Sequence, residues 1–543
     1  MWTMPGCSRF SGSAMRPRRR DMLRLAGALP ASAVANAARK PNFLVILADD
    51  MGFSDAGCYG GEIDTPNIDR LAHRGLRFTQ GYSTARCGPS RSCILTGRYA
   101  QQTASDVMTP GNIPDWTRFV PHHLKPLGYR SYHSGKWHIR FRPVAGAGFD
   151  RSYLLVDQNR FFTQTNHMLD DQSLPPVKQS DGYYATVSIA DHAIRFLREH
   201  RGDAPFFLYL AFTAPHFPLH ALQEDIDFYK DRFAEGWDTV RERRWQRMKR
   251  MGLIDCSLAR LEPEMRPPWN TPDAELIGKI GPGEVTRAVP WSTLTPEQRG
   301  FQRTKMAIHA AMITRMDREI GRVLAQLRAM NALDDTMTLF LSDNGASSEQ
   351  LIRADGHDAS APPGSARTHL CLGPGWESAA NAPFRLHKSW VHEGGIASPF
   401  IVHWPNGFKD QGKLRHNTCH FVDILPTLVA AGGGRLVTEP AAPEFAGKNL
   451  LPAFQKDGTV ARPFLYFHHS NNRAIRAGEW KLVAAGQSGP WELYDMRGDR
   501  AESKDLSGQE PERVQQMAAL WKQTDEEFVR AREAATPMAK DRM

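Results

Sequence analysis

Three runs of mostly apolar residues stand out along the chain, and polar residues follow each of them closely. The runs cover residues 42–48, 205–212 and 337–342, and the polar residues that follow are Asp49-Asp50, His216 and Asp343-Asn344. An apolar run of this length predicts a strand buried on both faces, as in a parallel sheet. Because ligands bind beyond the carboxyl ends of the strands in open α/β sheets, we expect these polar residues to share one site.

Amphipathic stretches separate the apolar runs. Apolar residues recur at helical spacing over residues 191–199 and 306–330, and residues 76–78 and 398–404 are predicted as further strands. Strands that alternate with helices are typical of an α/β fold. We therefore predict a large mixed, mostly parallel sheet sandwiched by helices.

The pattern changes in two places. Residues 225–300 are rich in Arg, Trp and Glu, and their charged part, 241–245, predicts a solvated surface helix followed by loops. From about residue 431, short segments at 474–476, 480–483 and 491–495 predict a small antiparallel sheet, with a terminal helix from about Glu510. We therefore expect a main domain over residues 38–430 and a C-terminal subdomain over residues 431–543.

The first 37 residues are predicted to be an export signal. Arg18-Arg19-Arg20-Asp21 resembles a twin-arginine motif, the apolar stretch from Leu25 to Val34 is too short to span a bilayer, and Ala35-Asn36-Ala37 suits cleavage. The alternative is a disordered basic tail before a first helix. Export of this type indicates a periplasmic or secreted protein, and no later stretch predicts a membrane span.

The composition and net charge indicate the kind of protein and which partners to expect. The chain has 543 residues, 41% of them hydrophobic and 23% charged, which is typical of a soluble globular protein. The net charge is +9, but residues 1–37 hold six arginines and one aspartate, so the remainder carries only +4. With no basic recognition helix or aromatic platform, this balance argues against nucleic acid as a partner. The six cysteines beyond residue 37 match neither a zinc module nor a small disulfide scaffold.

The stretch from Cys87 to Arg98 predicts a loop that turns into a helix. Pro89 suits the first helical turn, so Cys87 is expected at the helix N-terminus, where free N–H groups and the helix dipole favour negative charge. A cysteine there would have a lowered pKa and would be reactive. A buried, inert cysteine beside a tight turn is the alternative interpretation.

The same stretch resembles a known family signature. Cys87-Gly88-Pro89-Ser90-Arg91, followed by Leu95-Thr96-Gly97, is similar to the motif of type I sulfatases, the formylglycine-dependent arylsulfatase family of the alkaline phosphatase superfamily. Gly135-Lys136-Trp137-His138 resembles the second signature of that family, and Pro215-His216 resembles its Pro-His pair after a strand. Lys388, ahead of Glu393-Gly394-Gly395, resembles the late sulfate-binding lysine, although many members carry Arg where this chain has Ala397.

The resemblance implies an alkaline-phosphatase-like fold and a complete sulfate-ester site. A maturation enzyme would oxidise Cys87 to formylglycine, and one hydroxyl of the hydrated aldehyde would be the nucleophile. Arg91 and Lys136 would stabilise that group, His216 and Lys388 would bind sulfate and protonate the leaving oxygen, and His138 would deprotonate the second hydroxyl to expel sulfate. Asp49, Asp50, Cys87, Asp343 and Asn344 would hold a divalent cation, for which hard oxygen ligands favour Ca²⁺, with Mg²⁺ as the rival.

The expected substrate is a small sulfate ester or a sulfated carbohydrate, and residues 225–300 form either a lid over it or a plain surface helix. Two other functions stay open at this point. A phosphate or phosphonate ester hydrolase of the same superfamily would use similar metal carboxylates, and some of these enzymes carry formylglycine. A non-catalytic binder of sulfated glycans would keep the scaffold without the reaction, although all the matched polar residues are present in this chain.

Overall fold

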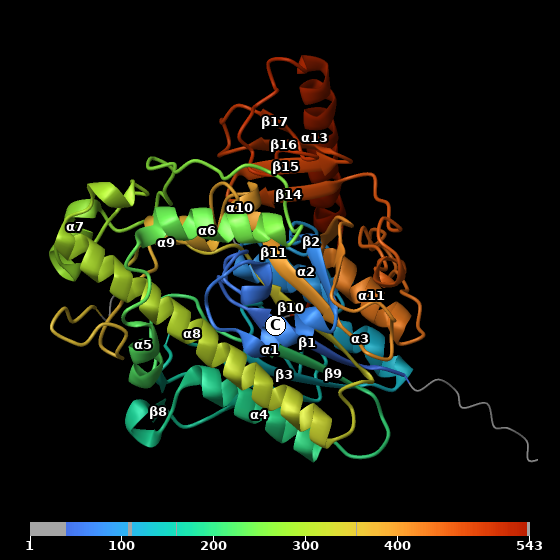
Figure 1. Ribbon diagram of the computed structural model, residues 1–543. Coiled ribbons are helices and arrows are strands. Elements are labelled where there is room, and N and C mark those ends of the chain that lie inside the picture. The colour runs from blue at the N-terminus through green and yellow to red at the C-terminus, as the bar shows by residue number, and fades with distance from the viewer. Residues whose placement is uncertain (1–39, 107–110, 159, 354–355, 540–543) are drawn as a thin grey trace, which may run out of the picture. The chain divides into compact units, whose positions relative to one another are not determined.

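A computed structural model describes residues 40–106, 111–158, 160–353 and 356–539. These residues form one compact unit built around a large sheet (Figure 1). The export signal predicted over residues 1–37 lies outside the described residues. In the described part of the chain, no helix is both long and apolar enough to cross a membrane.

The main sheet is mixed and has eleven strands within the described residues. Its order is β12-β2-β11-β10-β1-β9-β3-β4-β6-β7, with β13 beside β2. The strands are β1 (Asn42–Ala48), β2 (Leu76–Tyr82), β3 (Arg130–Lys136), β4 (Arg151–Leu155), β6 (His167–Leu169), β7 (Gln172–Ser173), β9 (Phe206–Ala211), β10 (Thr336–Ser342), β11 (Ala397–His403), β12 (Lys413–Arg415) and β13 (Cys419–His420). The central pairs from β10 to β4 are parallel, whereas β11 pairs antiparallel with β10 and β2. The predicted large, mostly parallel sheet is confirmed.

The side chains of strand β1 are buried in two hydrophobic cores, one on each face of the sheet. Leu44 and Ile46 belong to the core that contains α1 (Pro66–His73), α4 (Ala185–Glu199) and α8 (Pro296–Ala329). The alternate residues Phe43, Val45 and Leu47 belong to a second core, which contains α2 (Cys87–Thr96), α3 (Val120–Leu124) and α11 (Ile424–Ala431). All five are fully buried, and each contributes about 1.5–3 kcal/mol to stability. Helices therefore cover both faces of the sheet (Figure 1).

The three predicted strands are confirmed as β1, β9 and β10, and β1 lies between the other two. The register keeps their carboxyl ends level, because Ala48 pairs with Ser342 and Leu47 pairs with Ala211. The segments that carry Asp49, His216 and Asp343 consequently leave the sheet at one edge. This edge is where the sequence predicts a shared site.

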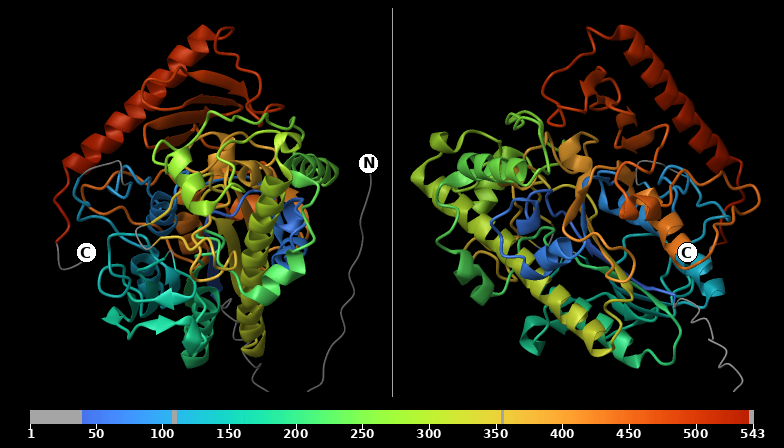
Figure 2. Two further views of the ribbon diagram at one scale, coloured as in Figure 1. Left: turned by 90° about the vertical axis from the view of Figure 1, so that its left-hand side faces the viewer. Right: turned by 45° about the vertical axis from the view of Figure 1, so that its right-hand side comes forward.

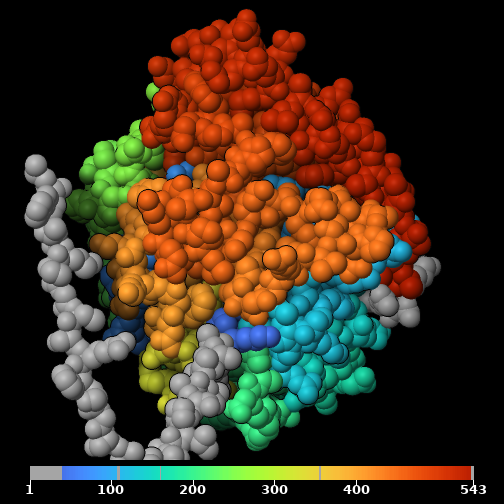
Figure 3. Space-filling view, turned by 90° about the vertical axis from the view of Figure 1, so that its right-hand side faces the viewer, coloured from blue at the N-terminus to red at the C-terminus, as the bar shows by residue number. Residues whose placement is uncertain are grey.

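A second, antiparallel sheet follows in the C-terminal part. It is formed by β14 (Leu465–His469), β15 (Asn472–Ala477), β16 (Trp480–Ala484) and β17 (Glu492–Asp495), and α13 (Pro511–Glu533) crosses one of its faces (Figure 2). Three of these strands and the helix are predicted from the sequence, and β14 is not. In Figure 3 this C-terminal part (red) packs against the segment around α11 (orange).

The segment 225–300 differs from its prediction. It contains the end of α5 (Gln223–Tyr229), then α6 (Gly236–Arg250) and α7 (Asp273–Ile280). A helix is correct for residues 241–245, but full solvation is wrong, because Arg241 and Arg244 are buried. Arg244 is tolerated in the interior since Asp55 and Glu62 compensate its charge.

The remaining elements are short. They are β5 (Thr163–Gln164), β8 (Val177–Lys178), α9 (Pro374–Ala380), α10 (Glu393–Ile396) and α12 (Leu451–Gln455). The segment between β10 and β11 carries Lys388, whose side chain contacts Asp50 just after β1. This segment completes the surroundings of the site.

Candidate active site

The helix that begins at Cys87 lies at the centre of the site. Helix α2 starts after Arg86, whose backbone is extended (φ −150°), and it ends at Gly97, which adopts the left-handed conformation (φ 65°). Pro89 lies in the first turn, as predicted, where its missing N–H breaks no intrahelical hydrogen bond. All ten helix residues are buried, and Cys87, like the other cysteines of the described chain, is a free thiol.

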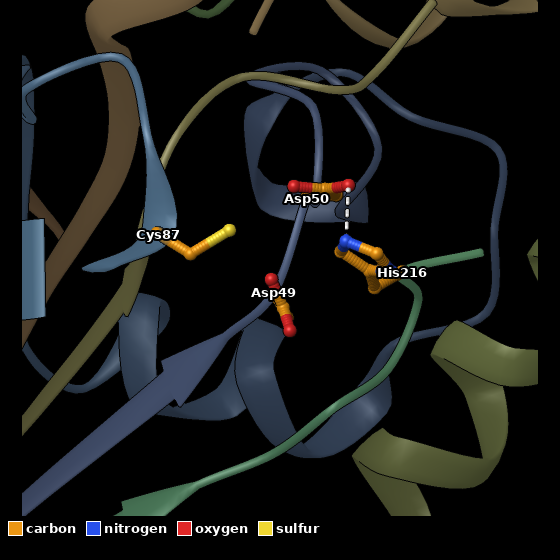
Figure 4. Close-up of side chains that lie close together, drawn as sticks. All are labelled: Asp49, Asp50, Cys87 and His216. Carbon is orange, nitrogen blue, oxygen red and sulfur yellow. Dashed lines mark ion pairs between the residues drawn. The ribbon is translucent and has the colours of Figure 1, made fainter. Parts of the chain in front are cut away.

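The two aspartates after β1 both face Cys87. Neighbouring residues of an extended strand point to opposite sides, so a turn is needed before both carboxylates can reach one site. Asp50 provides it by adopting a left-handed conformation (φ 63°), which costs a non-glycine residue about 1–2 kcal/mol. One atom each of Asp49, Asp50, Cys87 and His216 then lie within 4.8 Å of one another (Figure 4).

Asp343 and Asn344 join this cluster from β10. The backbone N–H of Asp50 donates to Asp343 Oδ1 at 3.3 Å, and Asn344 Nδ2 donates to Asp50 Oδ1 at 2.6 Å. Asp49 Oδ1 and Asn344 Oδ1 are buried and accept no hydrogen bond from the described residues. Buried oxygen acceptors without donors are costly unless a cation compensates them. The donor set therefore fits a hard divalent cation such as Ca²⁺ or Mg²⁺.

Three buried, positively charged side chains contact the three aspartates. Arg91 donates to Asp343 Oδ2 through Nε and Nη2, at 2.9 and 2.7 Å. Lys136 Nζ lies 2.5 Å from Asp49 Oδ2, and Lys388 Nζ lies 2.8 Å from Asp50 Oδ2. Every predicted cationic residue thus contacts a predicted metal-ligand carboxylate. An anionic group or a developing oxyanion at this point would meet several positive charges.

The pKa values in the site follow from its burial. Burial alone would raise the pKa of Asp49, but Lys136 and His216 outweigh it and hold the pKa well below its usual value. Burial raises the pKa of Asp343, with Asp49 adding to the effect. Burial also raises the pKa of the Cys87 thiol to about 12. The lowered pKa expected for this cysteine is therefore wrong, because loss of hydration outweighs the helix N-terminus and the nearby lysines.

His216 is fixed in one orientation. Its Nδ1 lies 2.5 Å from the carbonyl oxygen of Phe217, so Nδ1 carries the proton and donates it there. The other nitrogen, Nε2, lies 3.1 Å from Lys388 Nζ and 3.5 Å from Asp50 Oδ2. Burial, with Lys388 close by, lowers the pKa of His216 to about 4, so the imidazole is neutral at pH 7.

His138 occupies a different position from the other predicted residues. Its side chain is exposed, and its left-handed backbone (φ 59°) turns the chain after β3 toward the start of α2. A Cβ added at Gly88 would lie 3.2 Å from the His138 carbonyl oxygen, so the two segments are in close contact. His138 lines a cavity of about 340 Å³ together with Gly88 and Pro89. It therefore lies beside the first turn of α2 and is not part of the buried cluster.

Three further residues at the site are absent from the sequence prediction. Glu349 is buried and lies 3.1 Å from both Lys388 Nζ and Arg86 Nη1. Trp269 Nε1 donates to the same carboxylate at 2.7 Å, and the Arg86 guanidinium lies 5.5 Å from the centre of the Trp269 ring. Arg86 could have been noticed because it directly precedes Cys87, whereas no sequence pattern marks Glu349 or Trp269.

Comparisons with known proteins agree with this arrangement. A family model described as sulfatase matches residues 41–434, and a second, described as N-sulphoglucosamine sulphohydrolase, C-terminal, matches residues 384–531. The chain is 30% identical to an arylsulfatase of Klebsiella aerogenes, over 73% of this chain and 87% of that protein. It is 25% identical to an N-acetylglucosamine-6-O-sulfatase of Bacteroides thetaiotaomicron, over 87% of this chain and 83% of that protein.

A solved structure resembles the fold as well. The crystal structure of Ps i-CgsB in complex with k-i-k-neocarrahexaose superposes with a TM-score of 0.64 and 23% sequence identity, covering 90% of this chain and 93% of that one. The shared architecture is the large mixed sheet between helices with a small C-terminal antiparallel sheet. The alkaline-phosphatase-like fold class predicted from the sequence is confirmed.

Proposed function

The chain belongs to the sulfatase family and hydrolyses sulfate esters, and we propose that it does so through a formylglycine made from Cys87. The observation that carries the proposal is the convergence of the Cys87 sulfur with Asp49, Asp50 and His216 within 4.8 Å, at the start of a buried helix. A maturation enzyme would carry out the oxidation. The hydrated aldehyde would supply one hydroxyl for attack at sulfur and a second for release of sulfate.

The other residues would have separate roles in the reaction. Lys388 and His216 bind the sulfate oxygens, and a proton from this pair goes to the leaving oxygen as its bond to sulfur breaks. Arg91 and Lys136 offset the negative charge on the attacking side, where they already contact Asp343 and Asp49. His138, beside the first turn of α2, would take the proton of the second hydroxyl. Loss of that proton would allow the hydrated group at residue 87 to release sulfate as the aldehyde forms again.

We propose that Asp49, Asp50, residue 87, Asp343 and Asn344 hold a divalent cation, with Ca²⁺ as the first choice. The uncompensated oxygens of Asp49 and Asn344 support this assignment. When bound, the cation would polarise the sulfur–oxygen bonds. Asp50, held in its left-handed conformation, and Asn344, hydrogen-bonded to it at 2.6 Å, would keep the oxygen ligands in place.

A sulfated carbohydrate is the proposed substrate. Support comes from the N-acetylglucosamine-6-O-sulfatase relative and from the family model named after an N-sulphoglucosamine sulphohydrolase. We also propose export through the twin-arginine-type signal at residues 1–37 and a boundary between catalytic domain and C-terminal subdomain near residue 430. A reporter fused to residues 1–40 should leave the cytoplasm, and replacement of Arg19 and Arg20 by lysine should abolish its export.

The Cys87→Ser variant tests the central proposal. The enzyme is produced with a formylglycine-generating enzyme, and mass spectrometry of the peptide containing residue 87 should show replacement of the thiol by an aldehyde. Serine has only one hydroxyl and cannot expel sulfate, so Cys87→Ser should retain a sulfated residue 87 or lose turnover of an aryl sulfate. Cys93→Ser, on the same helix, is the matched control. Full multiple turnover by Cys87→Ser would refute the mechanism.

A further inference from the structure

The cavity beside the start of α2 is distinct from the buried cluster that handles the sulfate. It has a volume of about 340 Å³ and is lined by Arg86, Gly88, Pro89, Ser105, His138, Ile139 and Arg140. This volume lies at the lower end of the range for small-molecule sites, roughly 300–1,000 Å³. Gly88 lines the cavity and directly follows residue 87 in the chain, so the organic part of a substrate whose sulfate group lies at residue 87 would occupy this cavity.

The charged side chains that line the cavity are positive. Among the described residues, the lining includes two arginines, Arg86 and Arg140, and no carboxylate. Pro89 and Ile139 supply apolar wall, and Ser105 and His138 supply further polar groups. A neutral organic group would need no second arginine in such a small space. Two guanidinium groups around a confined volume are suited to a carboxylate or a second sulfate, which they can bind through paired N–H donors.

Arg86 is held in place before any ligand binds. Its Nη1 donates to Glu349 Oε1 at 3.1 Å and to Ser389 Oγ at 2.7 Å, and its guanidinium lies 5.5 Å from the Trp269 ring centre. Within the described chain, its hydrogen bonds are made through Nη1, which leaves Nε and Nη2 for a ligand. Fixed donors lose little conformational entropy when they bind an anion.

The charge of Arg86 is only partly neutralised by Glu349. The Glu349 carboxylate also contacts Lys388 Nζ at 3.1 Å, so Arg86 shares it with Lys388, which has Asp50 as a second partner at 2.8 Å. Arg140 is exposed, and its one hydrogen bond to the described residues is long, from Nη1 to the Gly111 carbonyl oxygen at 3.4 Å. Both arginines consequently keep positive charge available toward the cavity.

The support for Arg86 comes from segment 225–300. Trp269 belongs to it and is anchored next to Glu349, because Gln350 N donates to Asn270 Oδ1 at 3.0 Å and Thr271 N donates to Gln350 O at 2.9 Å. Trp269 Nε1 donates to Glu349 at 2.7 Å. This segment thus positions a substrate-binding arginine through Trp269, a role that neither a lid nor a plain surface helix describes.

We infer that this cavity is a subsite for a second anionic group, so that the enzyme acts on sulfated sugars that carry another sulfate or a carboxylate. Arg86 and Arg140 bind that group, and Trp269 and Glu349 are positioning residues for Arg86. The inference rests on the proposed sulfatase activity and specifies its substrate class.

Matched substrates test the subsite directly. Turnover is measured on 4-nitrophenyl sulfate, on a glucosamine 6-sulfate, and on the same sugar with a second sulfate. The native enzyme should prefer the disulfated sugar by at least tenfold in kcat/KM. Arg140→Ala should remove most of that preference by raising KM, while Arg86→Lys should keep more of it than Arg86→Gln. Trp269→Ala should resemble Arg86→Lys, because the charge remains but is less well held.

Two controls separate a failure of the subsite from a failure of the proposed function. Arg195→Ala, an exposed arginine on α4 paired with Glu199, should leave the preference intact. Titration calorimetry with the sugar that carries only the second sulfate measures the subsite without catalysis, and Arg140→Ala should weaken its binding at least tenfold. Formylglycine content of the Arg86 variants is checked by mass spectrometry.

The outcomes are distinguishable. No turnover of any sulfate ester by fully modified enzyme would contradict the proposed function, and the calorimetric arm would still decide the subsite. Turnover of the aryl sulfate with equal efficiency on both sugars, or Arg140→Ala that binds the second-sulfate sugar as tightly as the native enzyme, would overturn the subsite alone.

Discussion

Replacing Arg244 by leucine should destabilise the enzyme, because it removes the counter-charge of a buried aspartate. Arg244 Nη1 lies 2.8 Å from Asp55 Oδ1, and Nη2 lies 2.7 Å from Glu62 Oε1. The side chains of Arg244 and Asp55 are 0% exposed, whereas that of Glu62 is 15% exposed. Water can therefore reach Glu62 in the variant but not Asp55. The pair also ties α6 to the loop after β1, which carries the proposed metal ligands.

The magnitude follows from the burial of the pair. Removing one partner of a buried ion pair costs about 3–5 kcal/mol. Unfolding entropy of about 2.1 cal/mol/K per residue amounts, for roughly 500 residues, to about 1 kcal/mol per degree. Arg244→Leu should therefore lower Tm by about 3–5 °C. Addition of Asp55→Asn should recover part of this loss, because the uncompensated charge is then removed.

The assay is thermal unfolding followed by intrinsic fluorescence, at one fixed calcium concentration. Arg243→Leu is the matched control on the same helix, since Arg243 is 42% exposed and its partner Glu235 is 32% exposed. An exposed pair of this kind contributes less than about 1 kcal/mol, so the control should change Tm by no more than about 1 °C. Equal effects of the two variants would refute the reasoning.

The pH dependence of stability supplies a second readout for the same pair. Burial alone would raise the pKa of Asp55, but His309 and Arg244 outweigh it and hold the pKa at about 2 instead of 3.8. A carboxyl whose folded pKa is depressed stabilises the fold above its unfolded pKa and loses that contribution as the pH falls. The native enzyme should therefore lose stability between about pH 4 and pH 2. In Arg244→Leu this acid-induced loss should begin at higher pH.

Three further outcomes are expected. Calcium at about a hundredfold excess over its dissociation constant should stabilise the enzyme by about 2.7 kcal/mol, which raises Tm by about 2–3 °C. Asp50→Asn should abolish this rise in Tm, and an equal rise in that variant would place the ion elsewhere. Lys481→Met should cost about 3–5 kcal/mol in chemical unfolding, because buried Lys481 lies 3.0 Å from Glu393 and 2.7 Å from Glu502, whereas exposed Lys522→Met should change little. Gly345→Ala should lower Tm and weaken calcium binding, because the added Cβ would lie 1.8 Å from the Gly394 carbonyl oxygen. A Cβ added at Gly278 would have no atom within 4 Å, so Gly278→Ala should be neutral or stabilising.

The strand and helix framework could be predicted because its signal is local. A run such as 43–48 is apolar at every position only when both faces of a strand are covered, and the side chains of β1 are divided between two cores. The polar residues after β1, β9 and β10 could be assigned to one edge, since parallel strands end together. Strand β14 was not predicted. Arg241 and Arg244 are buried, although their charge predicts that they are solvated.

The fold class and the edge of the sheet where the polar residues gather could be read from the sequence alone, and the roles of the motif residues stay a proposal. The surroundings of Cys87 depend on the folded chain, where burial raises the pKa of its thiol to about 12 although a position at a helix N-terminus predicts a lowered value. The tertiary structure also brings Glu349 next to Lys388 and Arg86, which lie far from it in sequence. The physical reason is that hydration and ion pairing depend on neighbours from distant segments, whereas strand and helix periodicity depends on neighbours along the chain.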